Sequence, residues 1–295
     1  DAERAEGPPS RVWSGVFLGS CVTEMGLNLP TGVNVMRPSK PVRVAVVGAG
    51  HWGVNYVRVL VGMVGVEHLS VVDSNPAALA RIQKQFRGVR VESRLDSIVR
   101  DGGFSAAVVS TPAASHYDLV SLCLQGGMDV LAEKPLTLEV GQAERLAHRA
   151  QRKDLILMVG HTFLYNPAVR KLRDLLASGT CGDIYYMKAT RTHLGLIRTD
   201  VNAVWDLAPH DVSIFNYLAD ACPLSVSAIG GCFLNKKKED VAFITLRYPR
   251  NILAHIHVSW ADSNKERTVE VVGSKARIVF DDLNALERVK IFEKG

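Results

Sequence analysis

Short apolar runs alternate with segments of helical spacing through the first half of the chain. Valines dominate the run 42–47, which predicts a strand buried on both faces. Further strand-like runs lie at 68–73, 106–110, 129–132 and 155–160, and helix-like segments at 76–86, 116–125 and 138–152. This alternation predicts a doubly wound parallel sheet. Ligands of such sheets bind outside the carboxyl ends of the strands, so the residues that follow each strand are the first site candidates.

The second half of the chain has a different pattern. A helix is predicted over 169–178 and an alternating strand over 183–191. Short strands separated by turns follow at 225–233, 241–248, 252–260, 267–272 and 276–280. Their alternation predicts a mainly antiparallel sheet with one solvated face. The chain is therefore divided into an extension over 1–40, expected to be disordered or loosely attached, a first domain over 41–162 and an α+β domain over 163–295.

The turn after the first strand contains three glycines in a G-x-G-x-x-G spacing, Gly48, Gly50 and Gly53. In a dinucleotide site the first glycine permits the tight turn, the second lets the backbone approach the pyrophosphate, and the third lets helix and strand pack closely. His51 and Trp52 lie where the N–H groups of the helix start hold phosphates, and Trp52 is expected to pack over the cofactor. Because the motif follows a predicted strand, it indicates a Rossmann-type dinucleotide site.

Asp73 ends the second predicted strand, twenty residues after the third glycine. A carboxylate there accepts hydrogen bonds from a ribose 2′-hydroxyl and repels a 2′-phosphate. Ser74 is assigned to the same cofactor site, and neither Ser74 nor Asn75 is the arginine that an NADP site uses. NAD is therefore the predicted cofactor and NADP the less favoured one. The alternative is that Asp73 only opens the turn Asp-Ser-Asn-Pro.

Composition narrows the class of protein. The net charge of +5 is modest, and the one dense basic run, 236–238, is followed at once by two acidic residues, so no nucleic-acid-binding stripe is predicted. The sequence has no run of the roughly 18–20 apolar residues that a membrane span needs. The five cysteines form no CxxC pair, which favours a cytoplasmic protein without zinc or disulfides. His255 and His257 lack a neighbouring carboxylate or cysteine, so no metal site is predicted.

Polar residues follow three of the predicted strands. They are Thr111 and Pro112 with His116 shortly after, then Glu133-Lys134-Pro135, and then His161. Together with the glycine turn, these segments resemble the glucose–fructose oxidoreductase/inositol dehydrogenase family over about residues 41–282. The resemblance implies that five residues after the first two of these strands contact the cofactor: Thr111, Pro112, His116, Glu133 and Lys134.

The resemblance also implies a fold class. It is α/β plus α+β: an N-terminal Rossmann domain with a doubly wound parallel sheet, and a C-terminal domain with an open-faced, mainly antiparallel sheet. The second domain would bind the substrate and form a homo-oligomer through its sheet. Family members usually continue past the point where this chain stops, which leaves open a truncated C-terminus.

The segment 205–211, Trp-Asp-Leu-Ala-Pro-His-Asp, is the second group of residues with candidate chemistry. Asp206 is expected to cap a helix, with Pro209 in its first turn. Asp206 and His210 then lie on one face, matching the Asp-x-x-x-His pattern that in the family faces the substrate. Near the positive end of the helix dipole, the imidazole of His210 would accept a hydroxyl proton while Lys134 stabilises charge on the same oxygen. The alternative is a capping Asp and a helix-start His without chemistry.

Further residues are assigned to substrate binding: His161, Tyr165, Asn166, Arg191 and Trp205. The first three follow a strand at the expected cleft, with packing as the equal alternative. Arg191 ends a strand of the second domain and is a candidate for binding a phosphate.

The motif around His210 resembles the branch of the family that acts at C3 of nucleotide-linked sugars such as UDP-N-acetylglucosamine. The usual branch has glycine where Ala208 stands. The predicted protein is therefore an NAD-dependent nucleotide-sugar dehydrogenase, and the alternative is a dehydrogenase of free sugars or inositols. A second alternative is an NAD-binding sensor without turnover, which we would expect to have lost Lys134 or His210.

Overall fold

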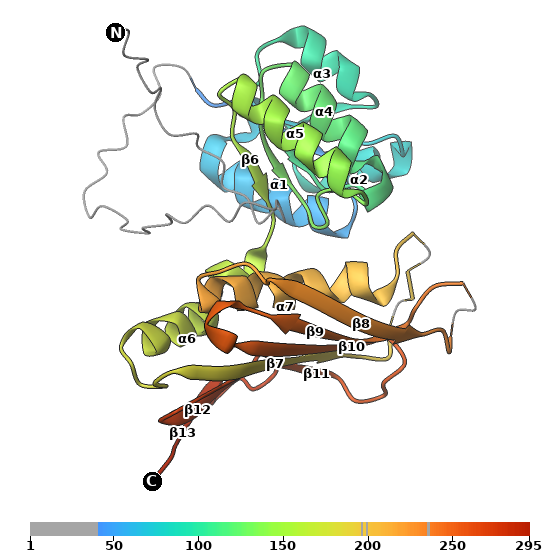
Figure 1. Cartoon of the computed structure of the whole chain (residues 1–295). Coiled ribbons are helices and arrows are strands. Elements are labelled where there is room, and N and C mark those ends of the chain that lie inside the picture. Colours follow the sequence, from blue (N-terminus) through green and yellow to red (C-terminus); the bar gives the residue numbers. More distant parts are fainter. Residues whose placement is uncertain (1–40, 196, 199, 235–236) are drawn as a thin grey trace, which may run out of the picture. The chain divides into compact units, whose positions relative to one another are not determined.

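The computed structural model describes residues 41–195, 197–198, 200–234 and 237–295 (Figure 1). The predicted extension, residues 1–40, lies outside the described residues. The described part divides into an N-terminal unit, residues 41–160, and a C-terminal unit, residues 161–295. Each unit has its own hydrophobic core.

The N-terminal unit contains a six-stranded parallel sheet with the order β3-β2-β1-β4-β5-β6. The strands are β1 (Val44–Val47), β2 (Leu69–Val72), β3 (Arg90–Glu92), β4 (Ala106–Val109), β5 (Asp129–Ala132) and β6 (Leu157–Val159). The helices are α1 (His51–Val64), α2 (Pro76–Gln85), α3 (Leu95–Asp101), α4 (His116–Gln125) and α5 (Val140–Arg152), with the 3-10 helices η1 (Val66–His68) and η2 (Ala113–Ser115). The strand order reverses between β1 and β4, which confirms the predicted doubly wound sheet.

Helices cover both faces of this sheet, as the burial of β1 shows. Val44 and Val46 pack with side chains of α1 and α2, whereas Ala45 and Val47 pack with side chains of α3, α4 and α5. The latter helices lie side by side in one layer (Figure 1). The continuous apolar run of β1 is therefore explained by burial on both sides.

Two elements of the N-terminal unit, β3 and α3, were not predicted from the sequence. β3 has three residues, none of them fully buried, and α3 has only seven. Both are too short for a periodic pattern of apolar residues to stand out.

The C-terminal unit contains a seven-stranded sheet with the order β13-β12-β11-β7-β10-β9-β8. The strands are β7 (Ile184–Thr192), β8 (Ser225–Gly231), β9 (Val241–Arg247), β10 (Leu253–Ser259), β11 (Glu266–Gly273), β12 (Ala276–Asp281) and β13 (Val289–Glu293). The helices are α6 (Pro167–Ala177) and α7 (Ala203–Ala219), with the 3-10 helices η3 (Thr162–Tyr165) and η4 (Pro249–Asn251). Only β7 and β10 pair in parallel among the described strands of this sheet.

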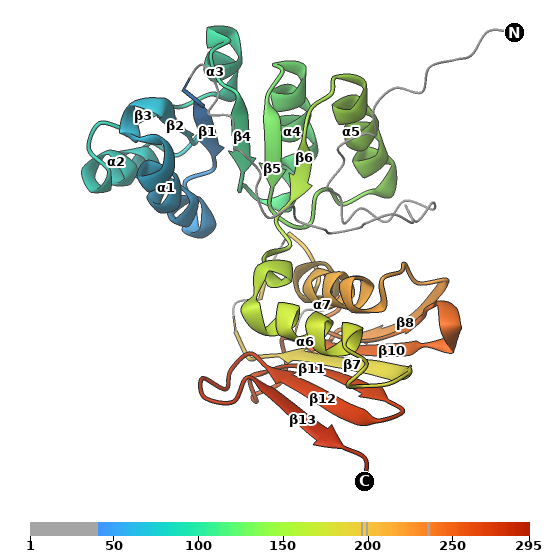
Figure 2. The ribbon, with the colours of Figure 1, turned by 90° about the vertical axis from the view of Figure 1, so that its left-hand side faces the viewer.

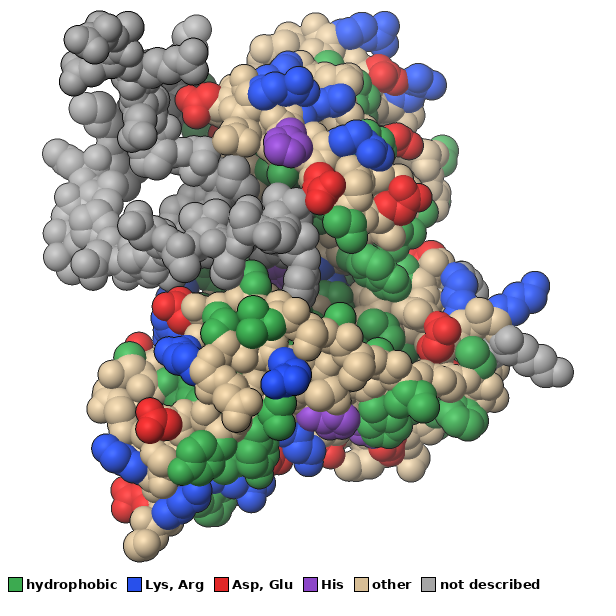
Figure 3. All heavy atoms as spheres, viewed as in Figure 1, with side chains coloured by type: hydrophobic (Ala, Val, Ile, Leu, Met, Phe, Trp, Pro, Cys, Tyr) green, Lys and Arg blue, Asp and Glu red, His purple; other side chains and the backbone are tan. Residues whose placement is uncertain are grey.

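Both α6 and α7 lie on one face of this sheet (Figure 2). Met187 and Ala189 of β7 point to that face and are fully buried, whereas Tyr186 of the same strand is exposed on the opposite face. Phe243 and Leu253 are also exposed there. Hydrophobic side chains gather over the strands of this unit in Figure 3. The prediction of an open-faced, mainly antiparallel sheet is therefore confirmed.

Candidate active site

The glycine turn after β1 has the geometry of a dinucleotide site. Gly48 has a φ of +100°, and a Cβ there would lie 2.9 Å from the carbonyl carbon and oxygen of Ser110. A Cβ on Gly53 would lie 1.8 Å from the carbonyl oxygen of Gly48, so helix and turn touch at that point. A Cβ on Gly50 would meet nothing within 4 Å. The first and third glycines are thus required by packing, whereas the second leaves space for a ligand to approach the backbone.

The start of α1 faces this turn. Gly50 is its N-cap, no side chain caps the helix, and its first turn has no acidic residue. The N–H groups of a helix start have no partner within the helix, and the helix dipole favours an anion beside them. His51 and Trp52 are both exposed at this position, as expected for residues next to a bound pyrophosphate. The residues present therefore fit a dinucleotide.

Asp73 follows β2 and is tied to the same turn. Its Oδ2 accepts a hydrogen bond from the Ala49 N–H at 2.7 Å, and its Oδ1 accepts one from the Asn75 N–H at 2.8 Å. The carboxylate therefore opens the turn after β2 and also supports the glycine turn. Arg81 of α2 donates to the carbonyl of Ala49 at 2.7 Å, which places a guanidinium at the same peptide. Arg81 lies eight positions beyond Asp73, and the residues directly after Asp73 gave no sign of it in the sequence.

The segment after β4 also touches the glycine turn. The Ser110 hydroxyl donates to the carbonyl of Gly48 at 3.1 Å, and Thr111 and Pro112 follow it directly. His116, however, is only 1% exposed, and its two ring nitrogens lie 2.8 Å from the carbonyl oxygens of Pro135 and Thr111. His116 therefore holds two loops together and does not present its ring to the cofactor as we had expected, because both nitrogens are taken up by the backbone.

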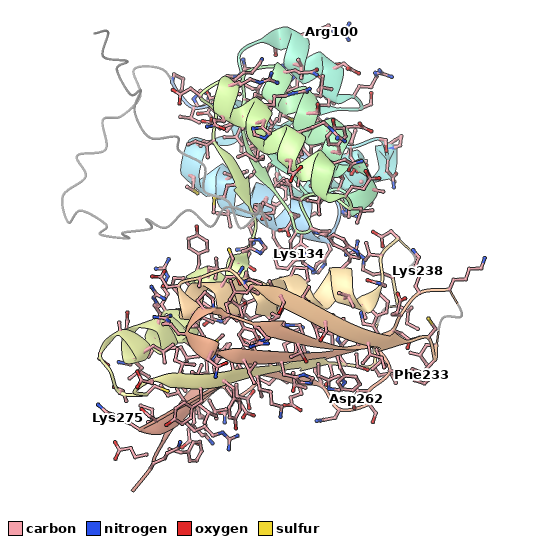
Figure 4. The ribbon with its side chains drawn as sticks, in the orientation of Figure 1. Arg100, Lys134, Phe233, Lys238, Asp262 and Lys275 are labelled. Atoms are coloured by element: carbon pink, nitrogen blue, oxygen red, sulfur yellow. The ribbon has the colours of Figure 1, made fainter. Side chains whose placement is uncertain are left out.

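The Glu133-Lys134 pair follows β5, with Lys134 at the end of that strand (Figure 4). Glu133 Oε1 accepts a hydrogen bond from the hydroxyl of Tyr56 at 2.7 Å, and Tyr56 belongs to α1. Burial, and then the hydrogen bond to Glu133, raise the pKa of Tyr56, so its hydroxyl stays protonated and keeps donating. The lysine segment is in this way linked to the helix that begins at the glycine turn. Nothing in the sequence pattern singled out Tyr56.

In the C-terminal unit, α7 begins earlier than predicted. Its N-cap is Asn202, whose side chain accepts a hydrogen bond from the Trp205 N–H at 3.0 Å. The prediction that Asp206 caps the helix is therefore wrong: Asp206 lies in the first turn, and Pro209 lies inside the helix. His210 is a further turn along, where the helix dipole has little effect on the imidazole. Asp206 and His210 still share one face, because they are four residues apart in one helix.

Asp206 has a partner that the sequence did not indicate. Its Oδ1 accepts a hydrogen bond from Nη1 of Arg198 at 3.1 Å, while Nε of Arg198 donates to Asp200 at 2.9 Å. The Asp206 side chain is 17% exposed. Arg198 therefore holds Asp206 in place in the part of α7 that carries His210.

Arg191 does not lie where a phosphate could meet it. Its Nε and Nη2 donate to the two carboxylate oxygens of Asp211 at 2.9 and 2.7 Å. The side chains of the pair are 5% and 0% exposed. The expectation that Arg191 binds substrate is not supported, since a buried carboxylate already takes up the guanidinium.

The other predicted substrate residues differ in exposure. His161 is buried, whereas Tyr165 and Trp205 are 56% and 39% exposed. The side chain of Asn166 caps α6 by accepting a hydrogen bond from Ala168 N at 2.9 Å, which is a structural role. Tyr165 and Trp205 keep exposed aromatic surface with which a sugar ring or base could pack.

Within the described residues, no group of three or more His, Cys, Asp or Glu side chains could hold a metal ion. None of the helices that the structure describes combines the length and apolar character needed to cross a membrane. Acidic and basic side chains are interspersed over the N-terminal unit on the face shown in Figure 3.

Comparison with known proteins adds independent information. Residues 42–161 match an oxidoreductase family with an NAD-binding Rossmann fold, and residues 169–279 match the GFO/IDH/MocA C-terminal domain. A UDP-N-acetylglucosamine 3-dehydrogenase from Acidithiobacillus ferrooxidans is 28% identical, over 86% of this chain and 77% of that protein. A myo-inositol 2-dehydrogenase from Thermotoga maritima is 23% identical, over 86% of this chain and 79% of that protein. The solved structure of GenD2 from gentamicin A biosynthesis, in complex with NAD, has a TM-score of 0.76 and is 27% identical, over 85% of this chain and 76% of that one.

Proposed function

The chain belongs to the oxidoreductase family with an NAD-binding Rossmann fold, and on that premise we propose that it moves a hydride between a secondary alcohol of a sugar and NAD. The observation that carries the proposal is the link between the cofactor turn and the lysine segment. Tyr56, on the helix that starts at the glycine turn, is hydrogen-bonded to Glu133, which directly precedes Lys134. We infer from this link that Lys134 lies beside the nicotinamide of a bound cofactor, where it would act on the substrate oxygen.

The chemistry divides between the cofactor and two side chains. Bound NAD supplies the acceptor for the hydride that leaves the alcohol carbon. His210 accepts the hydroxyl proton at an imidazole nitrogen, and Lys134 donates a hydrogen bond to the same oxygen, stabilising negative charge that develops there. The alcohol thus loses one hydride and one proton and becomes a ketone. In the reverse direction His210 returns the proton to the oxygen.

Asp206 is a candidate for orienting either His210 or a substrate hydroxyl. Its carboxylate shares the face of α7 with His210 and is held by Arg198. A carboxylate fixed in this way loses little freedom when it accepts a hydrogen bond from a sugar hydroxyl. This is the role that we propose for it.

Within the sugars, we favour C3 of a nucleotide-linked sugar such as UDP-N-acetylglucosamine. Two features support this choice: the similarity to the Acidithiobacillus enzyme and Ala208, at a position where the usual branch of the family has glycine. The second candidate is a free sugar or inositol, which the similarity to the Thermotoga enzyme supports. The exposed Tyr186, Phe243 and Leu253 on the open sheet face support a homo-oligomer. A cytoplasmic location, which the scattered cysteines of the sequence favour, is part of the same proposal.

The test is NADH formation by the purified chain with UDP- and dTDP-sugars, free glucose and myo-inositol, each compared with a Lys134→Ala variant. Turnover of a nucleotide sugar that the substitution abolishes supports the proposal. Turnover of free polyols only moves the activity to the second candidate. NAD binding without turnover of any sugar, unchanged by the substitution, contradicts a dehydrogenase and favours a sensor.

A further inference from the structure

Residues of α7, β7 and η3 in the C-terminal unit contact one another next to His210. Asp211, the next residue on α7, is fully buried and forms its two-pronged ion pair with Arg191 near the end of β7. Successive residues of a helix point about 100° apart, so anchoring Asp211 also sets the direction in which His210 leaves the helix. The ion pair therefore fixes the rotation of α7 at the position of the imidazole.

Phe163, in η3, lies between this ion pair and the imidazole. The Arg191 guanidinium carbon lies 4.5 Å from the centre of the Phe163 ring, over its face. The centres of the Phe163 and His210 rings are 5.0 Å apart, and the ring planes are inclined by 61°. This separation and inclination are those of a favourable edge-to-face aromatic contact, and the first contact is a cation–π interaction.

The three contacts form one continuous connection from the core of the unit to the imidazole. The guanidinium cannot turn away from the phenyl ring, because both of its bonds to Asp211 are buried. The half-buried phenyl ring is held on that side and in turn limits the rotation of the His210 ring. Rotation of an imidazole about its second side-chain torsion is otherwise soft, and it decides which nitrogen meets a substrate.

We propose that Phe163 is a positioning residue for His210, and that the buried Arg191–Asp211 pair supports Phe163 in that role. The inference rests on the proposed function, in which His210 transfers the proton. It also gives the buried Arg191 a role that does not involve substrate. Phe163 packs against the hydrophobic core of the unit as well, so the test needs a control in that core.

The test uses Phe163→Leu and Phe163→Tyr, with Phe280→Leu as the matched control. Phe280 belongs to β12, is 1% exposed and lies in the core of the same unit. NMR first follows the ring protons of His210, which the phenyl ring current of Phe163 shifts. Phe163→Leu is expected to remove that shift, whereas Phe163→Tyr and Phe280→Leu retain it.

Kinetics then measure the consequence. We expect Phe163→Leu to lower kcat by on the order of 10–100-fold with the Kd for NAD unchanged, because a misplaced base slows the chemical step. Phe163→Tyr should restore kcat, and Phe280→Leu should lower thermal stability without a comparable loss of kcat. The proposal is overturned if Phe163→Leu has the kcat of the wild type, or if its His210 ring-proton spectrum is the same as that of the wild type.

A double variant tests whether the Arg191–Asp211 ion pair supports Phe163. Arg191→Met with Asp211→Leu replaces a buried ion pair by apolar side chains, which proteins often tolerate in stability. It should fold and yet show the same change in the His210 ring-proton spectrum and the same loss of kcat as Phe163→Leu. Retention of both wild-type values contradicts the supporting role. His210→Ala separates this proposal from the proposed function. If that variant keeps the wild-type turnover, the role of His210 as base is wrong, while the NMR result still decides whether Phe163 positions the ring.

Discussion

The three glycines at the cofactor turn should respond to alanine in different ways. In Gly53→Ala the new Cβ lies 1.8 Å from the carbonyl oxygen of Gly48, and the gap must open to an ordinary contact of about 3.5 Å. Overpacking of this kind costs about 1–3 kcal/mol. For a unit of this size such a loss lowers the melting temperature by on the order of 10 °C. Because helix and turn move apart, NAD binding should also weaken.

Gly50→Ala, in contrast, should leave the stability of the unit almost unchanged. The φ and ψ of Gly50, −71° and −164°, are open to any residue, and the new Cβ meets nothing within 4 Å. The free energy of unfolding should therefore change by less than about 1 kcal/mol. The methyl group occupies the space in which the pyrophosphate approaches the backbone, so one charge-assisted hydrogen bond is lost. A loss of about 1.5–3 kcal/mol corresponds to on the order of a 10–150-fold rise in the Kd for NAD.

Gly62→Ala, in the same helix, is the matched control. A Cβ at Gly62 also meets nothing within 4 Å, and the residue is exposed in α1. The substitution should raise stability slightly and leave the Kd for NAD unchanged. Thermal unfolding and calorimetric titration with NAD on all three variants decide the matter. If Gly50→Ala binds NAD as tightly as Gly62→Ala, or if Gly53→Ala melts like the wild type, the reasoning about the turn is refuted.

Three further predictions concern single side chains. Lys134→Met should lower kcat by on the order of 10²–10⁴-fold and still bind NAD in calorimetry; a smaller loss would show that the lysine does not act on the reacting oxygen. Asp73→Ser should change the ratio of NAD to NADP affinity by on the order of 10–100-fold in favour of NADP, because the carboxylate is lost and Arg81 remains; an unchanged ratio in titrations with both nucleotides contradicts this. Arg198 holds the pKa of Asp200 below its usual range through a side-chain hydrogen bond, so the pair stabilises the fold above the ordinary carboxyl pKa and loses this effect as the pH falls through the lowered value. Urea unfolding should accordingly show Arg198→Met about 1 kcal/mol less stable at neutral pH, with the difference shrinking as the pH falls through and below the ordinary carboxyl range. A difference that stays constant over this range would argue against the ion pair.

The order of strands and helices in the N-terminal unit was predictable because its signals are local. Buried parallel strands such as β1 read as continuous apolar runs, and α2 begins with Asn75 as cap and Pro76 in its first turn. The glycine turn was predictable for the same reason, since the spacing of its three glycines is itself a local signal, and Gly48 and Gly53 are required by local backbone packing. The short β3 and α3 lack enough residues for such a signal.

What the sequence did not reveal depends on contacts between distant residues. The hydrogen bond from Tyr56 to Glu133 joins residues 77 positions apart in the sequence, and the one from Arg81 to Ala49 joins residues 32 positions apart. Arg191 looked like a surface cation because its strand ends there, yet the fold buries it against Asp211. The start of α7 was misplaced because Asp206 and Asn202 are both good caps, and only the structure shows which side chain accepts the hydrogen bond.

The most direct test of the central claim follows the hydride itself. The purified chain is incubated with NAD and with UDP-N-acetylglucosamine that carries deuterium at C3, and the nicotinamide product is examined by mass spectrometry. The account predicts NADH that contains one deuterium, and no such product from a Lys134→Met variant. If neither this substrate nor deuterated inositol transfers deuterium to NAD that the chain demonstrably binds, the proposed hydride transfer is contradicted.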